Sequence, residues 1–482
     1  MKTILVTTVP EETRMAIVSD DELLAVEVER ETHSHLVGNI YKGQIQNVLP
    51  GMQAAFVDIG AKKNAFMYIG NGAKLGEPKC LPNQGKLHIG QRIPVQIVKD
   101  AIGTKGPRAT THLSLPGRNV VLMPTAEYIG LSRRITSESE RQRLREIAEQ
   151  ICPAGMGLIV RTVAEGKSRE TLEDDVNYLT RLWESLQARN RLSAAPVLLY
   201  RDADLIIRIV RDYLTDDVER LIVDNSEVFQ RVKDLLEYLL PDFVGRVELY
   251  EGRQPLFKEY RIDEEIEKLG AREVELKSGG FIVIDRTEAL TVIDVNTGRY
   301  TGQSNLAETV YQTNMEAAAE ILKQLRLRDI GGIIIVDFID MDSDEKKELL
   351  LNFLRENVKH DRTKTNIVDI TPLGLVEITR KKSRQNLESI VYSECPCCHG
   401  RGRIESPETL AIRISRDIRR IEVKSHSMFG YEVEVNSQVE HEIEDTGILE
   451  SLSKRLNITI RLTSEAGRHP ESYSIVQLGS DD

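Results

Sequence analysis

Two apolar stretches of this sequence end in acidic side chains. In TVIDVNTG, Asp294 and Asn296 are two residues apart at the end of an apolar strand, so both side chains point to one face. In GGIIIVDFIDMDS, four β-branched residues lead directly into Asp337, and Asp340 follows. Because ligand sites of α/β sheets usually lie at the carboxyl ends of strands, we expect these groups to form one site.

Carboxylates from two neighbouring strands suit Mg²⁺, which takes few protein ligands and keeps several waters. A bound Mg²⁺ would activate water and stabilise charge on a phosphate. The other interpretation is that each acid caps a helix or ends a solvated strand. Two such strand ends in one α/β unit favour a metal site at Asp294 and Asp337.

A basic segment with many glycine turns, residues 36–113, is typical of a small β-barrel. It carries ten Lys and Arg against three Asp and Glu, although the net charge of the whole chain is -12. Strand alternation places Phe56 on the polar face, and Phe66 with Tyr68, where rings could stack on nucleic-acid bases. Lys105, in a glycine turn, could lie near a phosphate. Alternatively both Phe side chains belong to the core, as Phe usually does.

The segment SECPCCHGRG contains Cys395 and Cys398 at the CxxC spacing of a metal knuckle. Zinc normally takes four ligands, and the sequence has no second CxxC, so a closed thiolate site needs two Cys from a second subunit. A zinc ion shared across a homodimer follows. A redox CxxC and chance clustering are the alternatives. The other candidate ligands and thiols are Cys80, Cys152, Cys397 and His399.

Three further clusters contain basic residues. Arg161 and Thr162 end the strand GLIVRT and offer a guanidinium and a hydroxyl to a terminal phosphate. The basic runs at 133–134 and 380–384 are interpreted as solvated faces without an assigned role, although the second run could help to hold an RNA backbone.

Four kinds of element must position these residues. Alternating strands at 1–35 look too small to fold alone and could join the mixed segment 201–270. The barrel of 36–113 is followed by a mixed segment, 114–200, in which Ser137 and Glu140 are a candidate capping box. Strands and a helix with one buried face then form an α/β unit at 271–390.

The five cysteines and the absence of a signal-length apolar N-terminus predict a cytoplasmic protein with free or metal-bound thiols.

With these residues in view, the sequence resembles the ribonuclease E/G family over nearly its whole length. The matching stretches are GNIYKG, LPGMQAAFVDIG, QIVKDAIGTKG, GLIVRT, ELKSGGFIVID, DVNTG, GGIIIVDFIDM and CPCCHGRG. The sequence ends without the long Pro- and Arg-rich tail of the longer members, so the shorter members are the better match.

The resemblance implies a multidomain α/β and β fold. An RNase H-like domain (1–35 plus 201–270) would be interrupted by an S1 (OB-fold) RNA-binding domain (36–113) and a 5′-sensor region (114–200). A DNase I-like catalytic domain (271–390), a zinc link (391–403) and a small dimerisation domain (404–482) would follow.

The resemblance also implies an activity: Mg²⁺-dependent endonucleolytic cleavage of single-stranded RNA, with a preference for 5′-monophosphorylated ends and with 5′-phosphate and 3′-hydroxyl products. The substrates would be ribosomal RNA precursors and messenger RNA, and the chain would form a homodimer or a dimer of dimers.

The site residues implied by the resemblance fall into four groups. Asp294 and Asp337 would bind catalytic Mg²⁺, and Asn296 would orient the scissile phosphate. Phe56, Phe66 and Lys105 would hold the RNA. Gly117, Val121, Arg161 and Thr162 would bind the 5′-phosphate. Cys395 and Cys398 would supply half of an intersubunit zinc site.

Two residues depart from the family pattern. Lys364 stands where longer members have Arg behind the 5′-phosphate pocket, and it keeps the charge but loses the bidentate fork. Cys397 replaces a variable residue within the knuckle. Two other functions remain open from residues alone: a noncatalytic RNA-binding scaffold, which would not use the acids at the strand ends, and a DNA nuclease, which would use the same metal site.

Overall fold

A computed structural model describes residues 1–20, 22–30, 36–69, 87–101, 105–202, 204–298, 306–382, 387–425 and 430–479. The chain divides into two compact units, Met1–Val391 and Tyr392–Asp482. No helix within the described ranges is long and apolar enough to cross a membrane.

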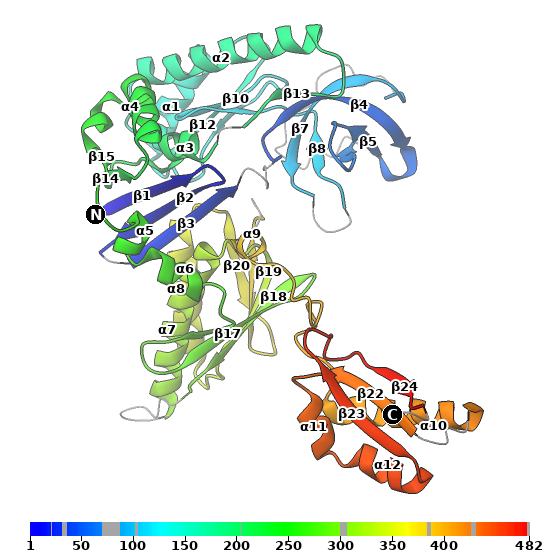
Figure 1. Ribbon diagram of the computed structural model, residues 1–482. Coiled ribbons are helices and arrows are strands. Elements are labelled where there is room, and N and C mark those ends of the chain that lie inside the picture. The colour runs from blue at the N-terminus through cyan, green and yellow to red at the C-terminus, as the bar shows by residue number, and fades with distance from the viewer. Residues whose placement is uncertain are drawn as a thin grey trace. The chain divides into compact units, whose positions relative to one another are not determined.

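The first sheet combines strands from two distant parts of the chain (Figure 1). β1 pairs with β2 in antiparallel fashion and with β14 in parallel fashion. In order across the sheet, the strands are β15 (Val247–Leu249), β14 (Val218–Val223), β1 (Lys2–Val9), β2 (Glu12–Ser19) and β3 (Glu22–Arg30). Its surrounding helices are α3 (Leu205–Arg208), the π-helix η4 (Ile209–Tyr213), α4 (Ser226–Leu239), α5 (Leu256–Glu259), α6 (Ile262–Lys268) and α9 (Leu387–Val391).

Strict alternation in β3 would bury Leu24 together with Val26 and Val28, but a bulge in this sheet changes that pattern. Leu23, rather than Leu24, is buried together with Val26 and Val28. The register shifts between Ile17 and Val18, so that Leu23 pairs with Val18. One extra residue in a strand reverses the faces on one side of the bulge.

The basic segment forms a closed barrel of five strands, which confirms the small barrel expected from the sequence. The strands are β4 (Ile40–Leu49), β5 (Ala54–Asp58), β6 (Ala65–Tyr68), β7 (Arg92–Lys99) and β8 (Arg108–Thr110). Closure comes from the pairing of β4 with both β5 and β7. A sixth strand, β13 (Val197–Tyr200), extends the sheet by pairing with β4.

A third, four-stranded sheet lies between the barrel and β13 in the sequence. Its strands are β9 (Leu115–Pro116), β10 (Val120–Met123), β11 (Ile129–Leu131) and β12 (Gly157–Val160). Two helices, α1 (Glu138–Ile151) and α2 (Arg169–Leu192), share its core. Ser137 caps α1 as expected, but the Glu140 carboxylate accepts hydrogen bonds from Arg143 and from the N–H of Gly166.

A six-stranded mixed sheet carries the acidic strand ends. In order across the sheet, its strands are β16 (Glu273–Glu275), β17 (Phe281–Arg286), β18 (Leu290–Asn296), β19 (Gly332–Asp337), β21 (Leu375–Arg380) and β20 (Thr365–Ile370). The strands β18 and β19 are parallel and are joined through α7 (Leu306–Leu327), while α8 (Asp344–Asn357) follows β19.

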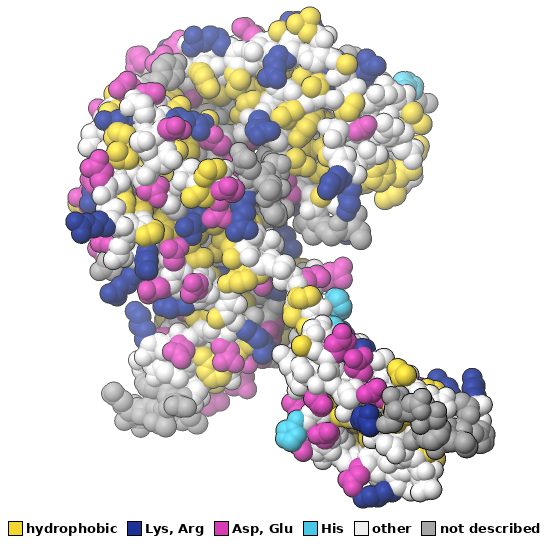
Figure 2. Space-filling view, viewed as in Figure 1, with side chains coloured by type: hydrophobic (Ala, Val, Ile, Leu, Met, Phe, Trp, Pro, Cys, Tyr) yellow, Lys and Arg dark blue, Asp and Glu magenta, His cyan; other side chains and the backbone are white. Residues whose placement is uncertain are grey.

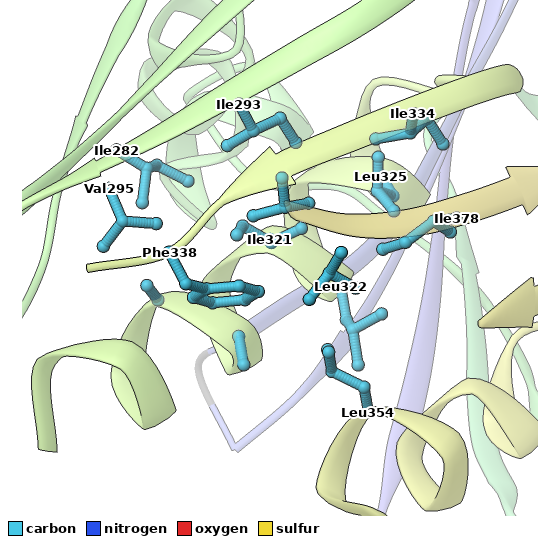
Figure 3. Packing of buried hydrophobic residues seen from close by; sticks show 14 of the residues in the cluster. Ile282, Ile293, Val295, Ile321, Leu322, Leu325, Ile334, Phe338, Leu354 and Ile378 are labelled. Carbon is cyan, nitrogen blue, oxygen red and sulfur yellow. The ribbon is translucent and has the colours of Figure 1, made fainter. Parts of the chain in front are cut away.

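Among the described residues, helices α7 and α8 cover one face of this sheet. Ile293, Val295 and Ile334 pack with residues of α7 and α8 (Figure 3), and Val336 belongs to the same core. The residues between them in β18 and β19 are less buried and lie on the other face. Because alternate side chains of a strand lie on opposite faces, burying this apolar set places the acids of β18 and β19 on the open face.

The second unit contains the cysteine knuckle and a three-stranded sheet. The strands are β23 (Thr459–Glu465), β22 (Gly430–Asn436) and β24 (Ser474–Gln477), and the helices are α10 (Pro407–Ser425), α11 (Glu440–Asp445) and α12 (Ile448–Leu456). Tyr431, Val433 and Ile414 are fully buried in its core. The domain boundaries named in the sequence analysis, including the zinc link, stay predictions.

Candidate functional site

The two acidic strand ends meet on the open face of the six-stranded sheet. Asp294 and Asp337 are direct partners in the parallel pairing of β18 with β19, and both side chains are exposed. Asn296 lies two residues beyond Asp294 on the same face, and its Nδ2 donates a hydrogen bond of 2.8 Å to Asp294 Oδ2. The structure therefore brings all three predicted residues together.

A buried amide holds the chain just after Asp337. The side chain of Asn314, in α7, is fully buried; its Nδ2 donates to the carbonyl of Ile339 at 2.7 Å, and its Oδ1 accepts from the N–H of Ile339 at 3.1 Å. Because both backbone groups of Ile339 are satisfied by one rigid side chain, the segment leaving β19 has a fixed path. Asp340 lies on this segment and is exposed.

The donor set at this face fits a hard divalent cation. Two exposed carboxylates and one amide provide oxygen ligands with room for water and phosphate, which is what Mg²⁺ prefers. No cluster of three or more His, Cys, Asp or Glu residues suited to a metal ion occurs in the described part of the chain. A site built here would therefore depend on two protein carboxylates and on oxygens from water or substrate.

A row of aromatic rings lies on the polar side of the barrel. Phe56 and Phe66 are cross-strand partners with ring centroids 5.8 Å apart, and the Phe66 and Tyr68 rings are 4.9 Å apart. Both Phe side chains are partly exposed, whereas Val57 and Met67 beside them are buried, so the predicted alternation is confirmed.

Basic side chains flank these rings. The Arg108 guanidinium lies 4.7 Å from the centre of the Tyr68 ring, and Arg108 pairs with Phe66 across β8 and β6. Lys105 is exposed three residues before Arg108. Figure 2 shows hydrophobic and basic side chains together on the visible surface of the barrel.

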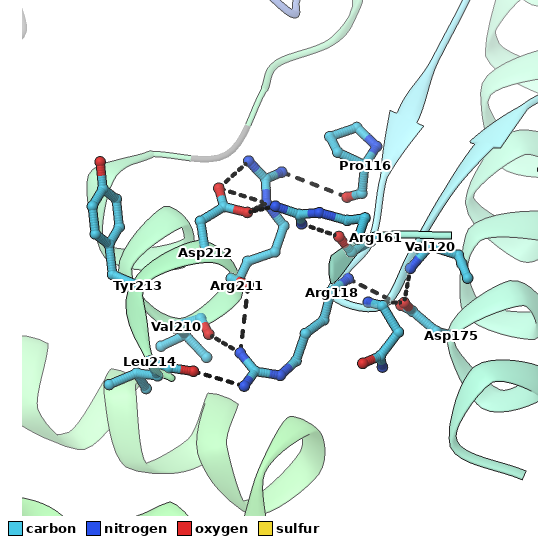
Figure 4. Close-up of polar contacts among 12 residues, drawn as sticks. Pro116, Arg118, Val120, Arg161, Asp175, Val210, Arg211, Asp212, Tyr213 and Leu214 are labelled. Atoms are coloured by element: carbon cyan, nitrogen blue, oxygen red, sulfur yellow. Dashed lines mark hydrogen bonds and ion pairs between the residues drawn. The ribbon is translucent and has the colours of Figure 1, made fainter. Parts of the chain in front are cut away.

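Arg161 is held in a polar cluster between β12 and η4 (Figure 4). Its Nη1 donates to the carbonyl of Gly117 at 2.6 Å, and its Nη2 donates to Asp212 Oδ1 at 2.6 Å. The Thr162 hydroxyl is 2.8 Å from that of Ser132. Val121 is the β10 partner of Pro116 and Ile159.

A buried carboxylate fixes the turn that carries Gly117. Asp175 of α2 accepts hydrogen bonds from the N–H groups of Asn119 at 2.7 Å and Val120 at 3.1 Å. Burial raises the pKa of Asp175, although these amides oppose the shift. A Cβ at Gly117 would lie 2.5 Å from Asp175 Oδ1, so this close approach requires glycine.

The basic run at 380–384 is not entirely a solvated face, because its first residue, Arg380, is buried. The Arg380 side chain is only 3% exposed, and its guanidinium donates to Asp361 at 2.8 Å and to Asp329 at 2.6 Å. Arg380 points inward because it shares the buried face of β21 with Val376 and Ile378. Lys381 and Lys382 are exposed, and the last two residues of this run lie outside the described residues.

The knuckle favours a thiolate at Cys395. Hydrogen bonds from the N–H groups of Cys398 and Cys397 lower the pKa of the Cys395 thiol. The backbone then turns sharply, with positive φ at His399, Gly400 and Gly402. Two thiols at CxxC spacing with amides directed at sulfur fit half of a tetrahedral zinc site.

A histidine from the far end of the second unit supports this knuckle. His469 Nδ1 accepts from the N–H of Glu471, so Nε2 carries the proton and donates to the carbonyl of Cys397 at 2.7 Å. Of the other two cysteines, Cys152 is partly buried in the first unit, and Cys80 lies outside the described residues.

Comparison with known proteins identifies the family of this chain. Residues 114–383 match the model of the ribonuclease E/G family, a span that includes Arg161, Asp294 and Asp337. The chain belongs to the ribonuclease E/G family. The family predicted from the motifs is thereby confirmed, and with it an RNA-cleaving enzyme.

Relatives within the ribonuclease E/G family cover most or all of the chain. It is 41% identical to ribonuclease G of Salmonella typhimurium over 87% of each chain. It is 38% identical to ribonuclease G of Haemophilus influenzae, with 98% of this chain and 99% of the relative aligned. Ribonuclease E of Haemophilus influenzae is 37% identical, with 99% of this chain but 52% of that longer protein aligned.

The family motifs did not identify every residue that surrounds these sites. Arg108, Asp175, Arg211 and Asp212 were not singled out from the sequence, because their roles depend on contacts between distant elements. One signal was available for Arg108, since an Arg near two predicted stacking residues in a basic segment is a candidate RNA contact.

Proposed function

We propose that this chain is a Mg²⁺-dependent endoribonuclease that cuts single-stranded RNA and prefers RNA with a 5′-monophosphate. Its products carry 5′-phosphate and 3′-hydroxyl ends, and its substrates are ribosomal RNA precursors and messenger RNA in the cytoplasm. The observation that carries this proposal is the pairing of Asp294 with Asp337 beside Asn296 on one open face.

The chemistry requires water to attack the phosphorus of a phosphodiester while the 3′-oxygen leaves. A Mg²⁺ ion held by Asp294 and Asp337 would supply Lewis acidity and a more acidic bound water. Asn296 holds the Asp294 carboxylate through its Nδ2 and lies where it can orient the scissile phosphate. The fixed segment after Asp337 keeps its carboxylate in register with Asp294.

RNA binding rests on the barrel and on the Arg161 cluster. Phe56 and Phe66 offer ring faces for bases, and Lys105 offers a charge to the backbone. Gly117, Val121, Arg161 and Thr162 form the proposed 5′-phosphate pocket. Its support is that Arg161 contacts the Gly117 carbonyl and retains 28% of its side-chain exposure.

We also propose that Cys395 and Cys398 bind zinc together with the same residues of a second subunit in a homodimer. The lowered pKa of Cys395 supports metal binding, since zinc takes the thiolate form.

The test of the proposed activity is cleavage of a 5′-monophosphorylated, A/U-rich single-stranded RNA in Mg²⁺. The native chain should cut internally, whereas Asp294→Asn and Asp337→Asn should bind RNA and lose about three orders of magnitude in rate. Asp340→Asn is the matched control, because Asp340 is a nearby exposed acid outside the register pair.

Three outcomes would replace the proposal. Cleavage that survives both substitutions would move the active site elsewhere, and RNA binding without cleavage by the native chain would favour the scaffold. Equal cleavage of a matched DNA oligonucleotide would favour a nuclease without selectivity for RNA.

A further inference from the structure

Asp212 lies at the centre of an ion-pair cluster and is shared by two guanidinium groups (Figure 4). It belongs to η4, in the part of the chain that follows the barrel and the third sheet. Arg161 Nη2 donates to Asp212 at 2.6 Å, and Arg211 Nη2 donates to it at 2.8 Å. Asp212 therefore connects η4 to β12, whose end carries Arg161.

Two contacts together determine where the Arg161 guanidinium points. The Gly117 carbonyl accepts from Nη1 and Asp212 accepts from Nη2, so the planar group is held at both terminal nitrogens. A guanidinium held in this way loses less conformational freedom when it binds an anion than a free side chain does.

The Asp212 carboxylate is paired with two guanidinium groups, those of Arg161 and Arg211. Burial raises the pKa of Asp212, but the hydrogen bond and charge of Arg211 and the charge of Arg161 outweigh burial and hold this pKa below its ordinary value. Asp212 is thus ionised at neutral pH, and two guanidinium groups share its one charge. Asp202 adds a further carboxylate 3.6 Å from Arg211, and the Asp175 carboxylate also interacts with the charge of Arg161.

The segment around Asp212 is itself anchored on both sides. Arg118 donates to the carbonyls of Val210 at 2.8 Å and Leu214 at 2.7 Å, which tie η4 to the turn after Gly117. On the other side, the Arg362 guanidinium lies 4.1 Å from the centre of the Tyr213 ring. Local π-helical geometry of this kind is frequent at functional sites.

We propose that Asp212 is a positioning residue for the 5′-end preference: it orients Arg161 toward the terminal phosphate of the RNA. This inference rests on the proposed 5′-phosphate pocket and adds to it a residue that acts through Arg161. Asp212 raises the selectivity for 5′-monophosphate over 5′-hydroxyl RNA.

The experiment compares two RNAs of one sequence, one with a 5′-monophosphate and one with a 5′-hydroxyl, and measures kcat and KM for each. Asp212→Asn keeps the size of the side chain and removes its charge. It should lower the ratio of kcat/KM for the 5′-monophosphate RNA to kcat/KM for the 5′-hydroxyl RNA by about tenfold. A change of this size corresponds to the loss of one hydrogen bond to a charged group. The ratio is independent of the folded fraction, because both substrates meet the same enzyme preparation.

Asp217→Asn is the matched control. It makes the same charge change five residues away, where Asp217 pairs with Lys2, and it should leave the ratio unchanged. Arg161→Ala should lower the ratio by itself. The double variant of Arg161→Ala with Asp212→Asn should lose no more than Arg161→Ala, because Asp212 acts only through Arg161.

The outcomes separate the two proposals. If Arg161→Ala keeps the native ratio, the pocket lies elsewhere and the inference about Asp212 is overturned with it. If Arg161→Ala loses the preference but Asp212→Asn keeps or increases it, the pocket stands and only the role of Asp212 is overturned. Additive losses in the double variant also overturn that role, since Asp212 would then act independently of Arg161.

Discussion

At the scale of single residues, Tyr68 extends the aromatic row of the barrel beyond the two predicted Phe side chains. It is 56% exposed, packs edge-on against Phe66 and carries Arg108 over its ring. An exposed ring with a guanidinium on one face adds little to the core, but it provides a base-stacking surface next to a positive charge.

Tyr68→Leu should therefore weaken binding of a short single-stranded RNA by about 1–3 kcal/mol, the contribution of one stacked base. The melting temperature should hardly change, because the ring is mostly exposed. Fluorescence anisotropy in EDTA measures binding without cleavage. Tyr128→Leu, another exposed tyrosine outside the barrel, is the control. Unchanged affinity in Tyr68→Leu would restrict stacking to Phe56 and Phe66.

At the scale of elements, β20 and β21 are tied to the segment before them by a buried ion pair. Arg380 donates to Asp361 and to Asp329, and the Thr365 hydroxyl donates to Asp361 at 2.9 Å. Burial raises the pKa of Asp361, but the hydrogen bond and charge of Arg380 outweigh burial and hold this pKa below its ordinary value. Arg380 is also a residue of β21, the strand that pairs with β19, and β19 carries Asp337.

Because the pKa of Asp361 is lowered on folding, its contribution to stability is present above the unfolded pKa of about 3.9 and is lost as the pH falls through the folded value. Asp361→Asn leaves a buried guanidinium without its main carboxylate and should destabilise the first unit by about 3–5 kcal/mol at neutral pH. Melting temperatures measured from pH 7 to pH 3 should converge for the native chain and the variant. A constant difference at all pH values would contradict this role.

At the scale of the whole molecule, the proposed zinc site needs more ligands than the CxxC pair of one chain provides. Within the residues that the structure describes, Cys395 and Cys398 are joined by no second CxxC pair, and Cys152 lies in the other unit. Thiolates from a second copy would complete the four ligands that zinc requires.

Native mass spectrometry should therefore find one zinc ion per two chains. Cys395→Ser and Cys398→Ser should each lose zinc and yield monomers. Both subunits carry the substitution, so each variant lacks two of the four proposed zinc ligands. Cys397→Ser should keep both zinc and the dimer, since Cys397 is outside the CxxC pair. A dimer that persists without zinc would show that other surfaces hold the subunits together.

Local patterns were sufficient for several predictions. Strand alternation predicted the polar face of Phe56 and Phe66 and the shared face of Asp294 and Asn296, because side chains of a strand alternate whatever its partners are. The Gly-rich basic segment predicted the small barrel, and the motifs predicted the family.

Tertiary structure decided the features that depend on pairing between distant segments. The register that places Asp294 beside Asp337 depends on the pairing of β18 with β19. A bulge near Ile17 determines that Leu23, and not Leu24, is buried with Val26 and Val28. Arg380 was expected in solvent and is buried, because a charge is stabilised inside only when carboxylates from other segments reach it. Sequence spacing alone determines which face a residue shares with its neighbours, but only packing determines which distant residue meets it.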